Sequence, residues 1–528
     1  MSLWSKIKQG ARIMAGELGK EYKDVFELED VPAFREFYNF SIFPAKFIYR
    51  GLYNPWHLIN APTIKDPQAK RTIFRMDMAK AVCQELASLV WAEGADIHIT
   101  TSGEDDRLER FVCEVLQKNG FNRKMQELIE QAAALGGAAL KEYVKVKHDD
   151  EGNPILGSEK LMIDYCMADQ FVPTSWDNAT ISEGFFVSRK AKDNYYYTRI
   201  EWHKWDGETY VVTNDLFRAP MKSPNGSDQD ILGFRYPLDG EFAYIVPRAE
   251  IKGISESLFA YFRTPMANNV DDNSPLGISV YGNAYDTLHA LDICYDSLVR
   301  EFRLGKKRII VPAQAVRTVI DPETGNPRRY FDANDEAYEA LSTDDPDSIK
   351  VQDNSMELRV EEHVSALNAL LSVLCLQIGF SAGTFTFDIK SGLKTATEVI
   401  SENSKTYKTI KNFQDQIKPA IERVCKNIIE LGILYGMEFE GNSIESLAKN
   451  YEISVMMEDA VLEDSSTRID RAIKLISNGL LSKKTAMTDP KYGLGMTEEE
   501  AEQELKAIGE EQRFSATAFD IFQTSTME

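Results

Sequence analysis

Apolar residues in the second half of the chain recur at alternating steps of four and three, the spacing of a helix with a packed seam. One such stretch lies within 278–305 and another within 358–379, and each predicts a helix of about 22 residues, roughly 33 Å long. The intervening residues 306–357 are polar and contain short strand and turn signals. The pattern therefore predicts a helical hairpin with a small module at its tip. The seam residues are Leu288, Leu291, Tyr295 and Leu298 on the first helix, and Val364, Leu367, Leu371 and Leu374 on the second.

The chain before this hairpin is predicted to be a mixed body of helices and strands. Within 70–147 the apolar period predicts one amphipathic helix that starts near Phe74 and two more at 107–118 and 122–135. A strand follows at 140–146, where apolar and polar residues alternate. We therefore expect helices packed on a sheet in this region.

Residues 150–265 are predicted to be rich in strands. Two alternating runs, 195–203 and 208–213, flank Asp206-Gly207, a strong signal for a tight hairpin. The many aromatic residues here favour packing on a sheet over a carbohydrate-binding face. Together with the helices on either side, these strands predict an α+β fold.

The chain after the hairpin is predicted to be mostly helical. The loop 380–392 leads into a third long helix within 393–437, and a strand near 451–457 precedes one or two helices in the tail. Pro419 lies inside the apolar stripe of the long helix. We expect a kink there, because proline removes one backbone hydrogen bond and clashes with the preceding turn.

Composition and charge narrow the class of protein. The 528 residues include 43% apolar residues, and 60 Lys and Arg against 83 Asp and Glu give a formal charge of −23. Such a composition excludes a disordered or fibrous chain, and no apolar run of about 18 residues predicts a membrane span. The six cysteines form no CxxC pair, which favours buried free thiols over disulfides or zinc. The acidity argues against a protein that grips DNA through a basic surface.

No pattern in the sequence predicts an enzyme. Walker, GxGxxG, HExxH and EF-hand motifs are absent, and the six histidines lack the spacing of metal ligands. The Gly136-Gly137 pair has no following Lys and Ser or Thr, so we interpret it as a place of close helix–strand packing instead of a phosphate cradle. We expect no catalytic residue, no metal and no cofactor.

Small basic clusters are better functional candidates than any catalytic motif. They consist of Lys306, Lys307 and Arg308 where the first hairpin helix ends, Arg328 and Arg329 within the insert, and Lys390 and Lys394 around the end of the loop. On one chain such clusters are ordinary solvated surface. In a ring of identical chains, each becomes a belt of repeated positive charge that a polyanion in the centre would meet.

The order of these features resembles the portal proteins of tailed bacteriophages, specifically the long-tailed type that infects Gram-positive bacteria. The resemblance lies in Ser274-Pro275-Leu276-Gly277 before a long helix, a small insert, a return helix, a loop with Phe and Gly, and Lys394-Thr395-Ala396-Thr397-Glu398-Val399 at the start of the kinked helix. It covers nearly the whole chain, although the first 60 residues or so carry little of it.

The resemblance implies an α+β portal fold with an α/β wing, a two-helix stem, a small α/β clip, a long kinked helix and a helical crown, assembled as a ring. The implied divisions are wing 1–277, first stem helix 278–305, clip 306–357, second stem helix 358–379, tunnel loop 380–392, long kinked helix and return strand of the wing 393–460, and crown and tail 461–528.

The resemblance also implies partners and a place. Twelve copies would form a homo-dodecamer at one capsid vertex of the virion, assembled in the cytoplasm of the host bacterium. Double-stranded DNA would pass through the channel transiently and without sequence preference. The terminase large subunit and later a head–tail adaptor would dock on the clip, where Arg328 and Arg329 are candidates. The major capsid and scaffolding proteins would be further partners, and no membrane is involved.

The resemblance places Phe385, Phe387, Lys390 and Lys394 at the surface that faces DNA. A charge of −23 per chain becomes −276 over twelve copies. A mainly acidic channel suits sliding, because each phosphate neutralised by protein adds affinity through released counterions. The alternative is a capsid or head–tail adaptor protein that is not an enzyme and has no DNA path. A carbohydrate hydrolase, the more distant alternative, would need a pair of carboxylates in a cleft.

Overall fold

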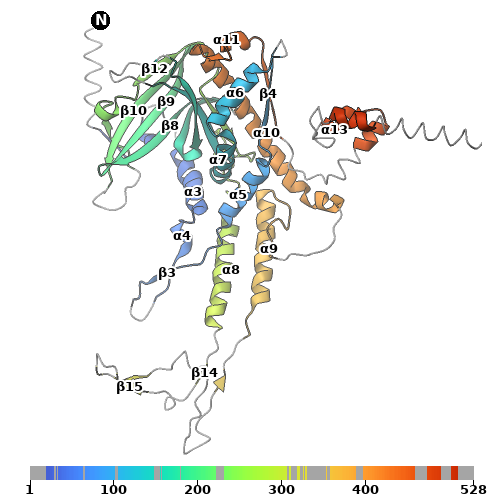
Figure 1. The fold of residues 1–528 in the computed structure, drawn as a ribbon. Helices are drawn as coiled ribbons and strands as arrows, with labels where there is room; N and C mark the ends of the chain where they lie inside the picture. The colour runs from blue at the N-terminus through green and yellow to red at the C-terminus, as the bar shows by residue number, and fades with distance from the viewer. Residues whose placement is uncertain are drawn as a thin grey trace, which may run out of the picture. The chain divides into compact units, whose positions relative to one another are not determined.

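The aromatic-rich strands form a seven-stranded antiparallel sheet in the order β1–β11–β10–β9–β8–β7, with β12 also paired to β10 (Figure 1). Its central hairpin joins β9 (Tyr195–Asp206) to β10 (Thr209–Pro220). Gly207 in the turn has a φ of +62°, a conformation that glycine adopts without steric cost. The hairpin predicted at this position is therefore confirmed. The other strands of the sheet are β1 (Glu21–Tyr22), β7 (Phe171–Asp177), β8 (Thr180–Lys192), β11 (Gly233–Tyr236) and β12 (Arg248–Ile251).

This computed structural model describes residues 20–28, 31, 34–62, 66–101, 105–147, 155, 157–178, 180–221, 231–305, 309–310, 318–320, 325, 327–329, 352–353, 357–387, 396–457, 472–488 and 501–508. The chain divides into two units, one comprising 1–389 and 409–458 and the other 390–408 and 459–528. The smaller unit includes α13 (Lys483–Thr488) and helical residues at 472–477 and 501–508.

A second, three-stranded sheet lies next to the large one and is covered by helices. Its central strand β5 (Gly137–Lys145) pairs with β13 (Phe259–Arg263) and β6 (Lys160–Met167). Helix α7 (Phe121–Leu135) packs on β5 and β6, and α5 (Met78–Val90) packs on α7. Apolar side chains from both sheets form a shared core of Ala139, Phe171, Ile181, Phe186 and Phe259.

The predicted helix near Phe74 starts later than its apolar period indicates. Helix α5 begins at Met78, and Asp77 before it has a φ of +52°, a left-handed conformation that a helix cannot contain. Residues before Asp77 run instead along another helix, where Phe74 contacts Arg303. The prediction was wrong at this end because a tertiary contact replaces the first helical turn.

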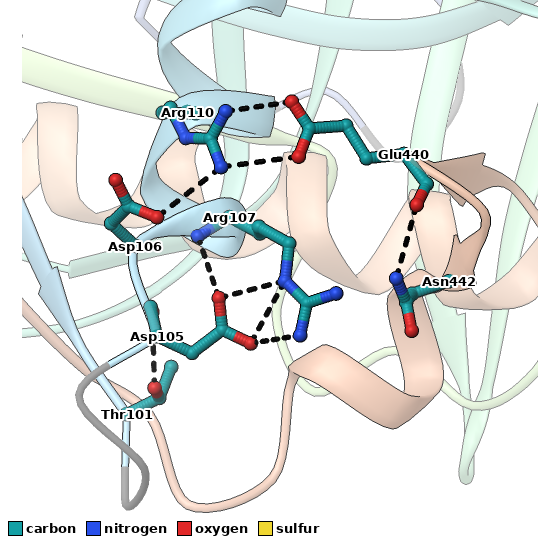
Figure 2. Close-up of polar contacts among 7 residues, drawn as sticks. All are labelled: Thr101, Asp105, Asp106, Arg107, Arg110, Glu440 and Asn442. Carbon is teal, nitrogen blue, oxygen red and sulfur yellow. Dashed lines mark hydrogen bonds and ion pairs between the residues drawn. The ribbon is translucent and has the colours of Figure 1, made fainter.

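The chain after the long helix α10 (Ala396–Leu434) returns to the body. Strand β20 (Glu452–Met456) pairs with β4 (Asp96–Thr100), which confirms the strand predicted near 451–457. Figure 2 shows Arg110 of α6 (Arg107–Lys118) contacting Glu440 in the turn between β18 (Glu438–Phe439) and β19 (Asn442–Ser443), with N–O distances of 2.6 and 3.1 Å. Beside it, the hydrogen bonds from Arg107 lower the pKa of Asp105 to about 2. The Arg110–Glu440 pair links segments that are 330 positions apart in sequence.

The predicted helical hairpin is present. Helices α8 (Tyr285–Leu304) and α9 (Val360–Ile378) pack side by side, and they are antiparallel, because Arg359 before α9 bonds Glu301 near the end of α8 at 3.0 Å. Between them, β14 (Ile309–Ile310) pairs with β17 (Gln352–Asp353), and β15 (Thr318–Ile320) pairs with β16 (Pro327–Arg329). The remaining elements of the larger unit are η1 (Val25–Glu27), α2 (Arg35–Phe37), η2 (Tyr38–Ile42), α3 (Phe43–Tyr49), α4 (Asn54–His57), β2 (Leu58–Asn60), β3 (Lys70–Thr72), η3 (Ala168–Gln170), η4 (Gly240–Phe242) and α11 (Ile444–Leu447).

The Gly136-Gly137 pair lies where the chain from 277 to 280 crosses the end of α7. A Cβ atom on Gly136 would collide with the carbonyl oxygen of Gly277, and a Cβ on Gly277 would collide with that of Gly136. Thr264 joins both segments, since its backbone N–H donates to the Gly136 oxygen at 3.0 Å and its hydroxyl donates to the Ile278 oxygen at 2.7 Å. The close packing expected at this pair is present, but the partner of Gly136 is the irregular segment 277–280 and not a strand.

Two charged residues on β5 are buried on opposite faces of the strand. The Lys141 ammonium donates to Glu201 at 3.0 Å. Glu142, 2% exposed, accepts at Oε2 from the Asn427 amide of α10 at 2.8 Å. Burial raises the pKa of Glu142 to about 8 and outweighs the opposing effects of Asn427 and Arg423. Glu142 Oε1 and Asn427 Oδ1 meet no donor among the described residues.

Replacing Gly277 by Ala should destabilise the body by roughly 1–3 kcal/mol, because the new Cβ overlaps a backbone oxygen that cannot turn aside. Urea unfolding measures the change. Gly432→Ala in α10 is the matched control, since its Cβ would approach side-chain atoms no closer than 3.3 Å. Equal stability of the two variants would contradict the predicted clash.

The raised pKa of Glu142 predicts a pH dependence with a defined sign. The folded-state pKa of about 8 exceeds the ordinary 4.5, so the native state keeps a proton that the unfolded chain has released between these values. Stability contributed by this proton is full below pH 4.5, falls as pH rises through the window, and levels off above pH 8. Glu142→Gln cannot ionise, so its free energy of unfolding should fall less steeply with rising pH than that of the unaltered protein. The two slopes should differ by up to about 1.4 kcal/mol per pH unit.

Urea unfolding at pH 5.5, 7 and 8.5 measures this slope. Glu208→Gln, at an exposed position, should keep the slope of the unaltered protein. Parallel curves for Glu142→Gln and the unaltered protein would contradict a protonated Glu142.

Candidate functional site

Helix α8 is held along one face by a segment from far earlier in the chain, residues 50–62 and 66–76, which we call the strap. Arg71 donates from both terminal nitrogens to the Asp296 carboxylate, at 2.9 and 2.6 Å. His57 Nε2 lies 3.0 Å from Asp292 Oδ2. The backbone N–H groups of Phe74 and Met76 donate to the same two carboxylates at 3.2 and 2.8 Å. The strap therefore supplies the partners that two helix aspartates need.

These aspartates are buried, with 8% of Asp292 and 5% of Asp296 exposed. A buried carboxylate is costly unless it is paired and hydrogen-bonded. The hydrogen bond from Arg71 lowers the pKa of Asp296, which stays charged and paired. One signal of this arrangement is present in the sequence, two Asp residues four positions apart on one face of the predicted helix, and our sequence reasoning missed it.

Aromatic contacts extend the strap along α8. The Trp56 ring stacks on His289 with centroids 5.1 Å apart and an angle of 12° between planes, and it meets the edge of Tyr285 at 6.0 Å. At the other end of the helix, the Arg303 guanidinium lies 4.9 Å from the centre of the Phe74 ring. The strap thus follows α8 over most of its length.

The strap and α9 contact opposite faces of α8. The strap meets His289, Asp292 and Asp296, whereas α9 and the residue before it meet Cys294 and Glu301. At about 100° per residue these two sets lie roughly half a turn apart. One protomer therefore presents the strap, α8 and α9 in that order, as Figure 1 also shows.

The predicted seam residues are buried most deeply near the body. On α8, Leu288 and Leu291 are buried, whereas Tyr295 and Leu298 are half-buried. On α9, Leu367, Leu371 and Leu374 are buried and Val364 is half-buried. Burial decreases toward the insert, where Phe302 is 51% exposed. The far half of the helix pair therefore leaves apolar side chains in contact with water.

The first part of the loop after α9 is tied to its own protomer. The Phe385 ring stacks on buried Phe380 with centroids 5.8 Å apart. Phe387 is 53% exposed, and its backbone N–H donates to Asn368 of α9 at 2.9 Å. Of the two predicted aromatic channel residues, Phe385 is half-buried and Phe387 is the more accessible.

The basic candidates fall mostly outside the described residues. This applies to Lys306, Lys307, Arg308, Lys390 and Lys394. Arg328 and Arg329 lie in β16, where their backbones pair with Val319 and Thr318 of β15. The structure thus places the clip candidates on a short two-stranded hairpin and leaves the two belts of positive charge as predictions.

Other sites of chemistry were sought in the part of the chain that the structure describes. No group of three or more His, Cys, Asp or Glu side chains there is arranged to hold a metal ion. No helix there is both long enough and apolar enough to cross a membrane. A cavity of about 730 Å³ opens beside α10, and two of the cations that line it, Arg423 and Lys426, are paired with Glu256 at 3.1 and 2.7 Å.

Comparison with known proteins gives a family. No curated protein matches the chain. Among solved structures, the neck of an empty GTA particle computed with C6 symmetry is similar over 77% of this chain and 87% of that chain, at 12% identity and a TM-score of 0.39. The virion of a native gene transfer agent particle is similar over 77% and 88%, at 10% identity and a TM-score of 0.38. The model of the family described as "Phage portal protein, SPP1 Gp6-like" matches residues 46–515. Because this match spans most of its length, the chain belongs to the phage portal protein family.

Proposed function

We propose that twelve copies of this chain form a ring at one capsid vertex and that double-stranded DNA enters and leaves the capsid through its channel. Family membership across residues 46–515 carries the proposal. The count of twelve rests on the resemblance of the sequence to portal proteins. The terminase large subunit would dock on residues 306–357 during packaging, and a head–tail adaptor would replace it afterwards.

The helix pair supports a ring. Tyr295 and Leu298 are half-buried and Phe302 is half-exposed, so a single chain leaves an apolar surface along a projecting pair of helices. Such surfaces in soluble proteins are generally covered by a partner. Neighbouring subunits in a ring would cover such a surface, and the two helices of each copy would form the stem.

The net negative charge of the chain supports a channel that lets DNA pass over one that binds it tightly. Sixty basic against 83 acidic residues leave little surface that could neutralise many phosphates. Affinity for DNA rises with every phosphate neutralised, because counterions are released. Lys390 and Lys394 would centre the duplex, while Phe385 and Phe387 would contribute apolar contacts that do not hold the backbone.

We further propose that the particle is a long-tailed phage of Gram-positive bacteria and that the ring assembles in the host cytoplasm with the major capsid and scaffolding proteins. The stretch 394–399 and the helix–insert–helix order support this subtype. The wing, clip, tunnel-loop and crown divisions given above belong to the same proposal.

Electron microscopy of the purified protein should show rings with a central hole wide enough for a DNA duplex. A ring can close when each subunit presents two different, complementary surfaces, one to each of its neighbours. Native mass spectrometry gives the number of subunits. A chain that stays monomeric at high concentration would contradict the proposal.

Replacing Lys390 and Lys394 by Gln should lower the amount of DNA packaged severalfold while ring yield stays unchanged, because these charges would act on DNA and not on the neighbouring subunit. Packaging into purified empty capsids with terminase measures this. Lys118→Gln, an exposed lysine on α6, is the control. Failed ring assembly with normal packaging per ring would instead favour the adaptor alternative, which has no DNA path.

A further inference from the structure

The outer face of α9 carries a second stripe of residues, all of them exposed. They follow one another at steps of four and three and are Glu362, Ala366, Ala369, Val373 and Leu376. At about 100° per residue this stripe lies roughly half a turn from buried Leu367, Leu371 and Leu374. Its end near the body is apolar, with Val373 45% and Leu376 68% exposed. Its end near the insert is acidic.

The strap is exposed on the side that faces away from α8. Leu52 and Leu58 are 58% and 42% exposed, and Leu58 lies on the face of the hairpin opposite to Arg71, because its register partner is Thr72. Strands β2 and β3 form a two-stranded sheet to which no third strand is added among the described residues. A two-stranded hairpin alone is marginally stable in water. Helix α8 covers one side of it, so a further contact on the open side would stabilise it.

The two exposed surfaces lie at the same height along the α8–α9 pair and carry opposite charges. The second part of the strap, residues 66–76, runs antiparallel to α8, since Met76 bonds Asp292 and Phe74 bonds Asp296. Lys70, exposed at the start of β3, therefore lies toward the insert. On α9 the exposed Glu362 is also at the insert end, next to the Arg359–Glu301 pair.

Nearer the body, the two surfaces are both apolar. Leu52 precedes Trp56, which meets Tyr285 at the first turn of α8. Val373 and Leu376 belong to the last turns of α9, and because α9 is antiparallel to α8 these turns lie beside the start of α8. Apolar residues would thus meet near the body and opposite charges near the insert.

We propose that the strap of one copy docks on the outer face of α9 of the next copy, so that this pair of surfaces forms the joint of the ring. The proposal rests on the ring proposed above. Because the two surfaces differ and lie on opposite flanks of α8, the contact is head-to-tail, the type that closes a ring by rotation. The order strap, α8, α9 then repeats around the stem, and the hairpin β2–β3 gains its second cover.

Two variants that each lose one surface test the joint. The strap variant carries Leu52→Glu and Leu58→Glu, and the α9 variant carries Val373→Glu and Leu376→Glu. Each alone should be monomeric by native mass spectrometry, because one half of every joint is missing. An equimolar mixture should form heterodimers, since the intact α9 of the first variant fits the intact strap of the second and growth stops there.

The possible outcomes distinguish a failure of the proposed joint from a failure of the proposed ring. If the unaltered protein forms no ring, the proposed function fails. If it forms rings while the mixture stays monomeric, or while either variant alone forms dimers or rings, the joint is elsewhere. Tyr244→Glu with Val246→Glu, at positions 66% and 58% exposed, is the control and should form rings like the unaltered chain. Cooperative thermal unfolding of each variant verifies its fold.

Exchanging the charges of Lys70 and Glu362 gives a second test of the joint that does not use the apolar substitutions. Lys70→Glu and Glu362→Lys should each lower the ring yield at low salt, because like charges would face each other across the joint. The double variant should recover the yield, since the pair is restored in reverse. A double variant as poor as the single ones would overturn the pairing of these two residues.

Discussion

Two buried aspartates on one helix determine how the projecting part of this protein is built. Asp292 and Asp296 are buried, and a buried carboxylate is costly to charge without partners. The partners come from residues 57–76, more than 200 positions earlier, and include two backbone N–H groups that no side-chain substitution can remove. Pairing with the strap therefore fixes one face of α8 against residues 57–76.

Much of the fold was predictable because local patterns decide it. The hairpin at Asp206-Gly207 follows from turn chemistry, and α6 and α7 follow from an apolar period with a glycine between them. The strap was not predictable, because its contacts depend on tertiary pairing and its sequence has no strong period. Phe74 shows the reason, since its apolar spacing fits a helix but its ring is used against Arg303.

The candidate site was predictable to a different extent. The heptad seams locate both hairpin helices, but a seam says only which side of a helix is apolar. Tyr295 and Leu298 satisfy the same spacing as Leu288 and Leu291, yet they are half-buried, because the body covers only the near half of α8. Likewise, spacing alone could not show that Phe385 stacks on Phe380 while Phe387 stays exposed. The basic belts at Lys306–Arg308, Lys390 and Lys394 stay predictions.

The attachment of the insert has a mechanical consequence. The chain enters it from α8 and leaves it into α9, and these connections are linked across by the Arg359–Glu301 pair and again by the pairing of β14 with β17. A module held by one link can swivel freely about that link. A module held by two connections that are bonded to each other resists rotation about either one. A twist applied at the insert is therefore transmitted to both helices together, and through α8 to the strap.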